Sequence, residues 1–363
     1  PTPAPAPSTG LAESTAPTEP VTAAPVVVAP PRPDKGEVSL SYWKSENFPV
    51  AIEGISIADV DGDGSNELVV INANQISVHR YGNEALQEIK AFSHKSFIRL
   101  IHLDAADING NGRSEIFVTD YNSNNQRLKS FVLEWNGQDF DIIDERIGWY
   151  LRVLKTPAAE PILLGQKRGT QPALGVPGIV KEILFHRDVH EMRYQDGHYK
   201  PANLYALPKG LSLYDFARGD LSNDGPNEIV AFSGRDRISI YNQKGEIAWE
   251  SEETYGGSRL LLEVPDPDDA PSRYGSVRKA RKTAIYYLPQ RIHITDIDRD
   301  GLNELVVLKN KDAASALSRI RNFKEGVIDC LSYDDIGTQL KWQTRTIPGY
   351  ISDYIIGDLD NDG

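Results

Sequence analysis

The chain has 363 residues, of which 40% are hydrophobic and 25% are charged, a composition typical of a globular protein with a large core. Its formal net charge of −13 excludes a nucleic-acid-binding role, because contacts with phosphates require a basic face. No apolar run reaches the roughly 18 residues that a membrane-spanning helix needs, so we expect no transmembrane segment within this chain.

Residues 1–36 are predicted to form a disordered linker. Ten of the first 33 residues are proline, alanine, threonine and serine supply most of the others, and no aromatic residue occurs. Such a segment has too little apolar surface to build a core. Because the chain begins at Pro1 rather than at methionine, we expect that it has been trimmed. The linker would then be a spacer after an upstream domain or a membrane anchor, as in a lipoprotein; a nonspecific tail is the alternative.

Acidic loops with a glycine at their sixth position occur five times in the rest of the chain. In the first loop, residues 59–67, oxygen-bearing side chains stand at positions 1, 3 and 5, glycine at position 6 and glutamate at position 9. The other copies are residues 107–115, 220–228, 296–304 and 358–363, and the last copy stops before position 9.

This spacing predicts several structural calcium sites. Ca²⁺ takes about six to eight oxygen ligands, and glycine at position 6 permits the positive φ of a sharp turn. Position 7 varies freely, as expected if only its backbone carbonyl binds the ion. An EF-hand would need glutamate at position 12, where Val70, Val118, Ala231 and Val307 stand, so that type of loop is rejected. The predicted ligands are Asp59, Asp61, Asp63, Ser65, Glu67, Asp107, Asn109, Asn111, Arg113, Glu115, Asp220, Ser222, Asp224, Pro226, Glu228, Asp296, Asp298, Asp300, Leu302, Glu304, Asp358, Asp360 and Asp362.

The four complete loops differ in charge. The loops at 59–67 and 296–304 each carry three aspartates and one glutamate, the loop at 220–228 carries three carboxylates, and the loop at 107–115 carries two. Two carboxylates about 4 Å apart repel by roughly 4 kcal/mol at an effective dielectric constant of about 20. We therefore expect calcium affinity to fall in that order, with the asparagine-rich second loop the most readily left empty. Asp/Asn/Gly turns without an ion are the alternative.

Two further marks recur with the loops. Each glutamate at position 9 precedes a short apolar run, which predicts a strand buried on both faces. An aromatic residue that leads into a turn predicts a β-hairpin. These predicted turns are Tyr81–Asn83, Trp135–Gly137, Tyr194–Gly197, Tyr241–Gly245 and Tyr333–Gly337. Tryptophans that mark the end of a unit are Trp43, Trp249 and Trp342.

The marks divide residues 37–363 into units that begin near residues 52, 98, 148, 210, 289 and 350. The unit at 148–209 keeps its hairpin but has no acidic loop. Repeats of about 40–50 residues with four strands each predict an all-β fold, a β-propeller of six blades, with seven also open. Glu37–Phe48 is expected to supply an outer strand that closes the ring. A β-sandwich with acidic turns is the alternative.

The pattern D-x-D-x-D-G-x-x-E followed by an apolar strand resembles the FG-GAP/VCBS repeat family, whose best-known members are the integrin α-subunit propellers. The resemblance covers roughly residues 37–363, and the chain is similar to bacterial exported proteins in which a propeller follows a low-complexity leader. It implies that each loop joins two strands of a blade and holds Ca²⁺, and that the protein serves adhesion or assembly. Ser222, Asn109 and Asn111 depart from the family pattern at aspartate positions.

Residues 258–290 are predicted to be an insertion. The segment begins acidic at 266–269 and turns basic at 278–282, with Tyr274, Tyr286 and Tyr287 nearby. We expect a solvated flap; a loop that binds an anionic glycan or the acidic surface of a partner is the alternative.

No phosphate-binding, zinc-protease or nucleophile motif occurs, so we expect no catalytic residues, no organic cofactor and no enzymatic activity. The leading hypothesis is a calcium-stabilised interaction or adhesion module at the surface, outer envelope or exterior of a bacterial cell, which binds a protein or a surface glycan. A carbohydrate-binding or polysaccharide-lyase-like propeller is the alternative, and would require Tyr286, Tyr287, Arg291 and His293 to converge. A structural subunit of a cell-surface assembly is a further alternative. Cys330, the single cysteine, is expected to be a buried strand residue.

Overall fold

The computed structural model describes residues 43–93, 98–170, 180–233, 236–266, 283–312, 321–334 and 336–362. The described residues from 45 to 362 belong to one unit. The predicted linker at 1–36 and the basic stretch at 278–282 lie outside the described residues. In the described part of the chain, no helix has the length and apolar character of a membrane span.

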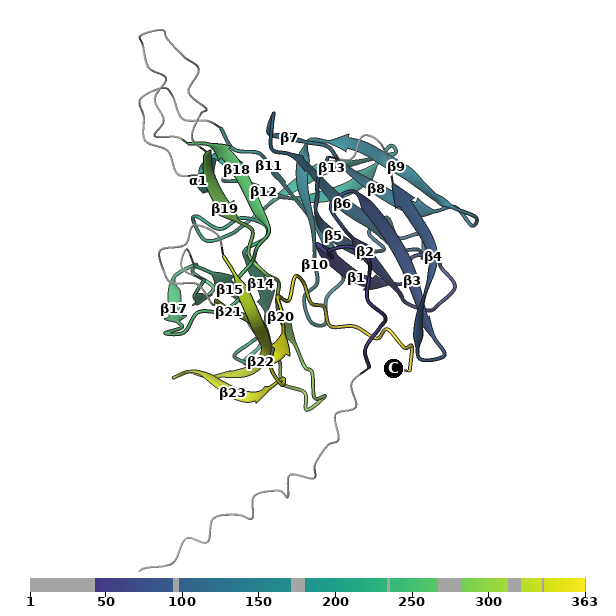
Figure 1. Cartoon of the computed structure of the whole chain (residues 1–363). Coiled ribbons are helices and arrows are strands. Elements are labelled where there is room, and N and C mark those ends of the chain that lie inside the picture. Colours follow the sequence, from purple (N-terminus) through teal and green to yellow (C-terminus); the bar gives the residue numbers. More distant parts are fainter. Residues whose placement is uncertain are drawn as a thin grey trace, which may run out of the picture. The chain divides into compact units, whose positions relative to one another are not determined.

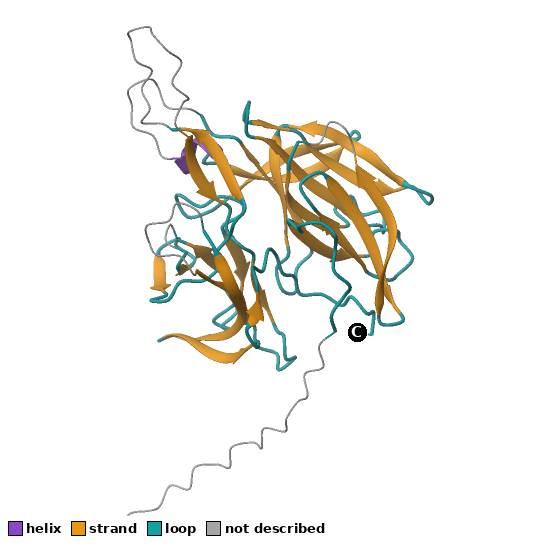
Figure 2. Ribbon diagram, viewed as in Figure 1, coloured by secondary structure: helices purple, strands orange, loops and turns teal. Residues whose placement is uncertain are grey.

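Five antiparallel sheets, built entirely from described residues, follow one another as the blades of a β-propeller (Figures 1 and 2). Blade 1 contains β1 (Gly54–Ala58), β2 (Glu67–Ile71), β3 (Gln75–Gly82) and β4 (Ala85–Ser93). Blade 2 contains β5 (Leu100–Ala106), β6 (Glu115–Asn122), β8 (Ser130–Trp135) and β9 (Phe140–Ile147), with β7 (Arg127–Leu128) beside β6. Blade 3 contains β10 (Trp149–Leu154), β11 (Ile162–Lys167), β12 (Val189–Gln195) and β13 (His198–Tyr205). Blade 4 contains β14 (Phe216–Gly219), β15 (Glu228–Phe232), β16 (Ile238–Tyr241) and β17 (Ile247–Glu250). Blade 5 contains β20 (Ile292–Thr295), β21 (Glu304–Asp312), β22 (Phe323–Asp334) and β23 (Gly337–Gln343), with β24 (Ile347–Pro348) beside β22.

The prediction of an all-β propeller with four-stranded units is confirmed, and the unit at 148–209 forms blade 3 without an acidic loop. The prediction of six or seven blades is wrong, because the structure has five. The repeat marks a loop rather than a sheet, and residues 350–362 contain an acidic loop but no strand. Residues 43–48, the described part of the predicted closing strand, also contain no strand.

The local marks correspond to fixed places in a blade. All five aromatic turns join the third strand of a blade to the fourth, as predicted, and Trp249 and Trp342 lie on the fourth strands β17 and β23. The apolar runs after the acidic loops form the second strands, in which Val69, Val306 and most other residues are buried. Cys330 is fully buried on β22, as expected.

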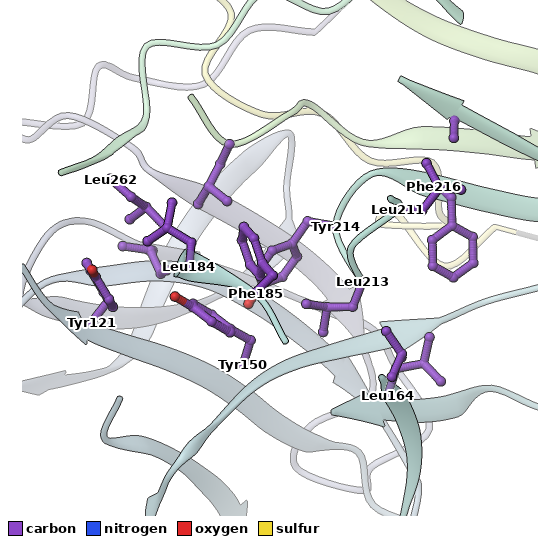
Figure 3. Close-up of a cluster of buried hydrophobic side chains, with 14 of the residues drawn as sticks. Tyr121, Tyr150, Leu164, Leu184, Phe185, Leu211, Leu213, Tyr214, Phe216 and Leu262 are labelled. Atoms are coloured by element: carbon purple, nitrogen blue, oxygen red, sulfur yellow. The ribbon is translucent and has the colours of Figure 1, made fainter. Parts of the chain in front are cut away.

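Hydrophobic clusters lie between neighbouring blades and hold them together. One joins Val69 and Ile76 of blade 1 to Leu103 and Phe131 of blade 2. The cluster in Figure 3 gathers Tyr121, Tyr150, Phe185, Tyr214 and Leu262. Full burial of each such side chain contributes about 1.5–3 kcal/mol of hydrophobic free energy.

The insertion at 258–290 contributes to this cluster. Its described parts form an antiparallel pair, β18 (Leu261–Pro265) and β19 (Thr283–Tyr287), which contacts the short helix α1 (Val180–Leu184). Leu262 and Val264 are each only 1% exposed. The expectation of a solvated flap is therefore wrong for these strands, because their apolar side chains complete a core.

A buried ion cluster joins the first strands of several blades. Arg291, next to β20, lies 2.5 Å from Asp104 of β5 and 3.1 Å from Asp353, and it also donates to the carbonyl oxygens of Ile55 and Leu103. Burial would raise the pKa of Asp104, but the charge of Arg291 and the neighbouring imidazole hold that pKa well below its usual range. The carboxylate therefore stays ionised inside the protein.

The segment after β24 lies between β20 and β1 without forming a strand. Asp353 accepts a hydrogen bond of 3.0 Å from the backbone N–H of Ile55 on β1. Gly357 approaches Ile57 so closely that an added Cβ would lie 3.3 Å from that side chain, and Gly219 of β14 approaches β20 in the same way. Residues 351–358 thus lie beside β1 in the way that the first strand of one blade lies beside the first strand of the next.

Candidate metal centres

Each complete acidic loop joins the first and second strands of a blade and has the same internal hydrogen bonds. The aspartate at position 1 accepts from the backbone N–H of the glycine at position 6, at 2.8–2.9 Å. The glutamate at position 9 accepts from the backbone N–H of position 2, at 2.8–3.1 Å. The position-6 glycines have φ angles from 84° to 104°, as the sequence predicted.

Three loops bring carboxylate oxygens close together, with all chosen oxygens of a group within 4.8 Å of one another. The groups are Asp59, Asp61 and Glu67; Asp296, Asp298 and Asp300; and Asp358, Asp360 and Asp362. Oxygens bound to one Ca²⁺ at about 2.3–2.6 Å lie no more than about 5.2 Å apart. Both the donor type and the spacing therefore fit a hard cation. Among the described residues, the loops at 107–115 and 220–228 form no such group of three.

Two loops already contain a positively charged side chain. Arg80 of β3 places Nη2 2.6 Å from Asp61, 2.8 Å from Asp63 and 2.8 Å from Glu67. Lys341 of β23 places Nζ 2.8–3.3 Å from three carboxylates of the loop at 296–304. These hydrogen bonds raise the pKa of Lys341 above its usual range. A metal ion bound among these carboxylates would have to displace the guanidinium or the ammonium group.

The second loop has an acidic partner that the sequence analysis missed. Glu134 accepts hydrogen bonds from the side-chain amides of Asn109 and Asn111, at 2.6 and 2.9 Å. The hydroxyl group of Tyr199 donates to Glu115. Arg80 pairs with Glu67, the closing glutamate of the first loop, and Glu134 comes directly after Leu133, which pairs with Ile116, the residue after Glu115. That cross-strand pairing is the signal from which both neighbours could have been found.

With every charged neighbour counted, the formal charges of the four complete loops are −3 or −2 and do not follow the predicted order. The loop at 59–67 has −4 + 1 = −3 with Arg80, and the loop at 296–304 has −4 + 1 + 1 = −2 with Arg299 and Lys341. The loop at 107–115 has −2 + 1 − 1 = −2 with Arg113 and Glu134, and the loop at 220–228 has −3 by itself. Charge alone therefore gives no reason for the predicted order of affinity.

Asparagines link neighbouring loops. Asn303 donates its backbone N–H to the side chain of Asn223 at 2.7 Å, and its side-chain amide donates to the carbonyl oxygen of Asp220 at 2.8 Å. Asn66 makes the same two bonds with Asn361 and with the backbone of the last loop, at 2.6 and 2.8 Å. The loop at 358–362 thus meets the first loop as the third meets the fourth.

Replacement of Lys341 by glutamine is expected to lower the melting temperature of the metal-free protein and to raise calcium affinity about tenfold. The first effect follows because Asp298, Asp300 and Glu304 lose their counter-charge, and the second because no ammonium group remains to be displaced. Calorimetric calcium titration and thermal melts measure both. Lys200→Gln, which removes an exposed pair with Asp196, is the control. Unchanged or weaker calcium binding by Lys341→Gln would contradict this role of the ammonium group.

The residues considered for a lyase do not converge. Arg291 and His293 line one cavity at the centre of the blades. Tyr286 instead donates a hydrogen bond to Asp215 at 3.2 Å, and the ring of Tyr287 faces a different arginine. Because Arg291 is held by two carboxylates, its charge is already compensated.

Comparison with known proteins identifies a repeat in the first two blades. Residues 59–118 match the family model described as FG-GAP-like repeat. No curated protein matches the sequence. The solved structures that resemble the chain include the exotype rhamnogalacturonan lyase YesX, with 10% identity over 83% of this chain and 66% of that chain and a TM-score of 0.38. They also include BBS1N in its complex with ARL6DN, with 10% identity, coverages of 80% and 81% and a TM-score of 0.36. Sqt1 of Saccharomyces cerevisiae has 9% identity, coverages of 81% and 85% and a TM-score of 0.34. The chain therefore carries an FG-GAP-like repeat, which spans the first acidic loop and the second, within a five-bladed β-propeller.

Proposed function

We propose that this protein is a non-catalytic, calcium-stabilised propeller that binds a protein partner outside the cell. The calcium binding in this proposal rests on one loop geometry that recurs along the chain. In three copies of the loop, the carboxylate oxygens lie close enough together to bind one Ca²⁺ in each copy. The bound ions would neutralise the loops that join first and second strands and would so hold neighbouring blades in register. The role of calcium here is structural, since it fastens the scaffold that displays the binding surface.

A groove between the fourth strands of blades 4 and 5 is the surface best suited to a partner. Its volume is about 580 Å³, and Trp249, Tyr255, Ile336 and Leu340 line it. Ile336 is 89% exposed and Leu340 57% exposed, and contiguous exposed apolar side chains of this kind mark interaction sites. Five further lining residues carry carboxylates, against one lysine, Lys309; they are Glu250, Glu252, Glu253, Asp329 and Asp334. The matching partner surface is apolar with basic side chains around it.

The proposed location follows from the calcium sites. Loops of this kind suit the millimolar calcium found outside cells better than cytosolic concentrations. The proline-rich composition of residues 1–36 agrees with a spacer that holds the propeller away from its point of attachment. The proposed setting is a bacterial cell surface or outer envelope, as the resemblance to exported FG-GAP/VCBS proteins implies.

The experiment is capture of surface proteins by the immobilised full chain, with calcium and with EDTA, together with a glycan array. We expect one protein to be retained only with calcium, and Ile336→Asp to abolish its retention. Leu204→Asp on β13, a residue 64% exposed and outside the groove, is the matched control and should bind as wild type. Selective glycan binding, or release of unsaturated products from an acidic polysaccharide, would contradict the proposal in favour of a carbohydrate-active propeller.

A further inference from the structure

A second cavity, separate from the acidic loops, lies at the centre of the propeller. It has a volume of about 240 Å³, far more than the ~15 Å³ that one water molecule needs. Its charged and titratable lining groups are Asp104, Arg152, Lys155, Arg291 and His293. The cavity is therefore mainly cationic, although the chain as a whole has a net charge of −13.

The acidic groups of this centre are already engaged. Asp104 contacts Arg291, lies 2.9 Å from Nε2 of His102, and accepts from the backbone N–H of Val153 at 2.8 Å. Asp353 is also bound to Arg291. The side chains at the centre thus have a formal net charge of 3 − 2 = +1. The cations are Arg152, Lys155 and Arg291, and the anions are Asp104 and Asp353. Burial lowers the pKa of His293 to about 4, so that ring is neutral at physiological pH and adds no charge.

Arg152 is a buried cation that forms no ion pair with a carboxylate of the described residues. It is only 8% exposed. It donates one hydrogen bond, to the carbonyl oxygen of Leu213, and its guanidinium group stacks over the ring of Phe216 at 5.1 Å. Buried arginines are nearly always paired, because an uncompensated buried charge costs several kcal/mol. The remaining N–H groups of Arg152 are therefore suited to bind an anion.

Lys155 adds a second cation at the mouth of the same cavity. The pairing of Leu154 with Ile162 in blade 3 corresponds to that of Ala58 with Glu67 in blade 1. Lys155 consequently stands where the other blades have the first aspartate of their acidic loop. It is exposed to solvent, and no ion pair within the described residues includes it.

We propose that this central cavity binds a small oxyanion, the carboxylate or phosphate group of a small molecule. The guanidinium group of Arg152 and the ammonium group of Lys155 supply the charge, and the hydroxyl groups of Thr156 and Thr295, which also line the cavity, can donate hydrogen bonds. Blade 3 has thus exchanged the acidic loop of the other blades for one that carries a cation. This site is independent of the proposed calcium and partner sites.

The test is calorimetric titration of the full chain with inorganic phosphate in one arm and with acetate and succinate in the other, at constant ionic strength set by chloride. We expect saturable binding in at least one arm, and at least tenfold weaker binding by Lys155→Gln, whose exposed side chain can be changed without loss of the fold. Arg152→Gln should weaken binding similarly if it remains folded by circular dichroism. Lys311→Gln, which removes a surface pair with Glu325, is the matched control and should bind as wild type.

The two arms also identify the anion, because phosphate-selective and carboxylate-selective binding are separate outcomes that each support the site. Equal affinity of Lys155→Gln and the wild type would overturn the proposal. Heat signals that do not saturate in either arm would overturn it too, and Arg152 would then serve only to pack against Phe216. Because no calcium is needed in these titrations, failure here leaves the calcium and partner sites untouched.

Discussion

Calcium added to the metal-free protein is expected to raise its melting temperature by about 5 °C or more, and EDTA should reverse the change. An ion that binds only the folded state contributes about 2.7 kcal/mol per site at a concentration 100 times its dissociation constant. Three groups of carboxylates have the required spacing, and each kcal/mol shifts the melting temperature of a domain of this size by about 2 °C. Scanning calorimetry with and without calcium measures the effect.

The variant Asp61→Asn with Asp298→Asn should lose most of this calcium-dependent increment, because each substitution removes one ligand charge while keeping the side-chain shape. Asp139→Asn is the matched control, since Asp139 is an exposed partner of Lys90 outside the loops. A melting temperature that does not respond to millimolar calcium would contradict metal binding. The loops would then be turns whose charge is balanced by Arg80 and Lys341 alone.

Replacement of Arg291 by methionine is expected to lower the free energy of unfolding by about 3–5 kcal/mol. The substitution leaves the carboxylates of Asp104 and Asp353 buried without a partner, and an uncompensated buried charge carries a penalty of that size. It also removes the hydrogen bonds to the carbonyl oxygens of Ile55 and Leu103. Urea denaturation at neutral pH measures the change.

The matched control is Arg237→Met, which removes a half-exposed pair with Glu250 and should cost less than about 1 kcal/mol. The variants should also differ in acid. A lowered pKa of Asp104 contributes stability that is present above its unfolded pKa of about 3.9 and lost as the pH falls toward the folded value. Without Arg291 the folded pKa rises and this contribution disappears. Equal stability of Arg291→Met and the wild type would contradict a central role for the ion cluster.

The blade architecture was predictable because short local sequence patterns specify its parts. The glycine at position 6, the apolar second strand and the aromatic turn each depend on residues close in sequence, and all three formed as expected. The number of blades was not predictable in the same way. A strand forms only where another strand pairs with it. Residues 358–362 have the sequence of an acidic loop, but residues 350–362 form no strand.

The site was predictable only in part, because its neighbours come from other strands. Lys341 reaches its loop from β23, 37 residues after Glu304, and no local pattern marks it. Arg80 and Glu134 follow their closing glutamates by 13 and 19 residues, and strand register alone would have revealed them. The central cluster had a weaker signal, namely charged residues such as Asp104 and Arg152 within apolar first strands.

The asparagine bonds between adjacent loops mean that the candidate calcium sites do not act one at a time. Because Asn66 fastens the first loop to the backbone of the last, and both loops hold a group of three carboxylates, an ion that orders either loop would pre-organise the other. Thermodynamic reciprocity requires that each ion favour its neighbour by the same factor. Binding isotherms steeper than those of independent sites are the expected consequence, and Asn66→Ala should flatten them.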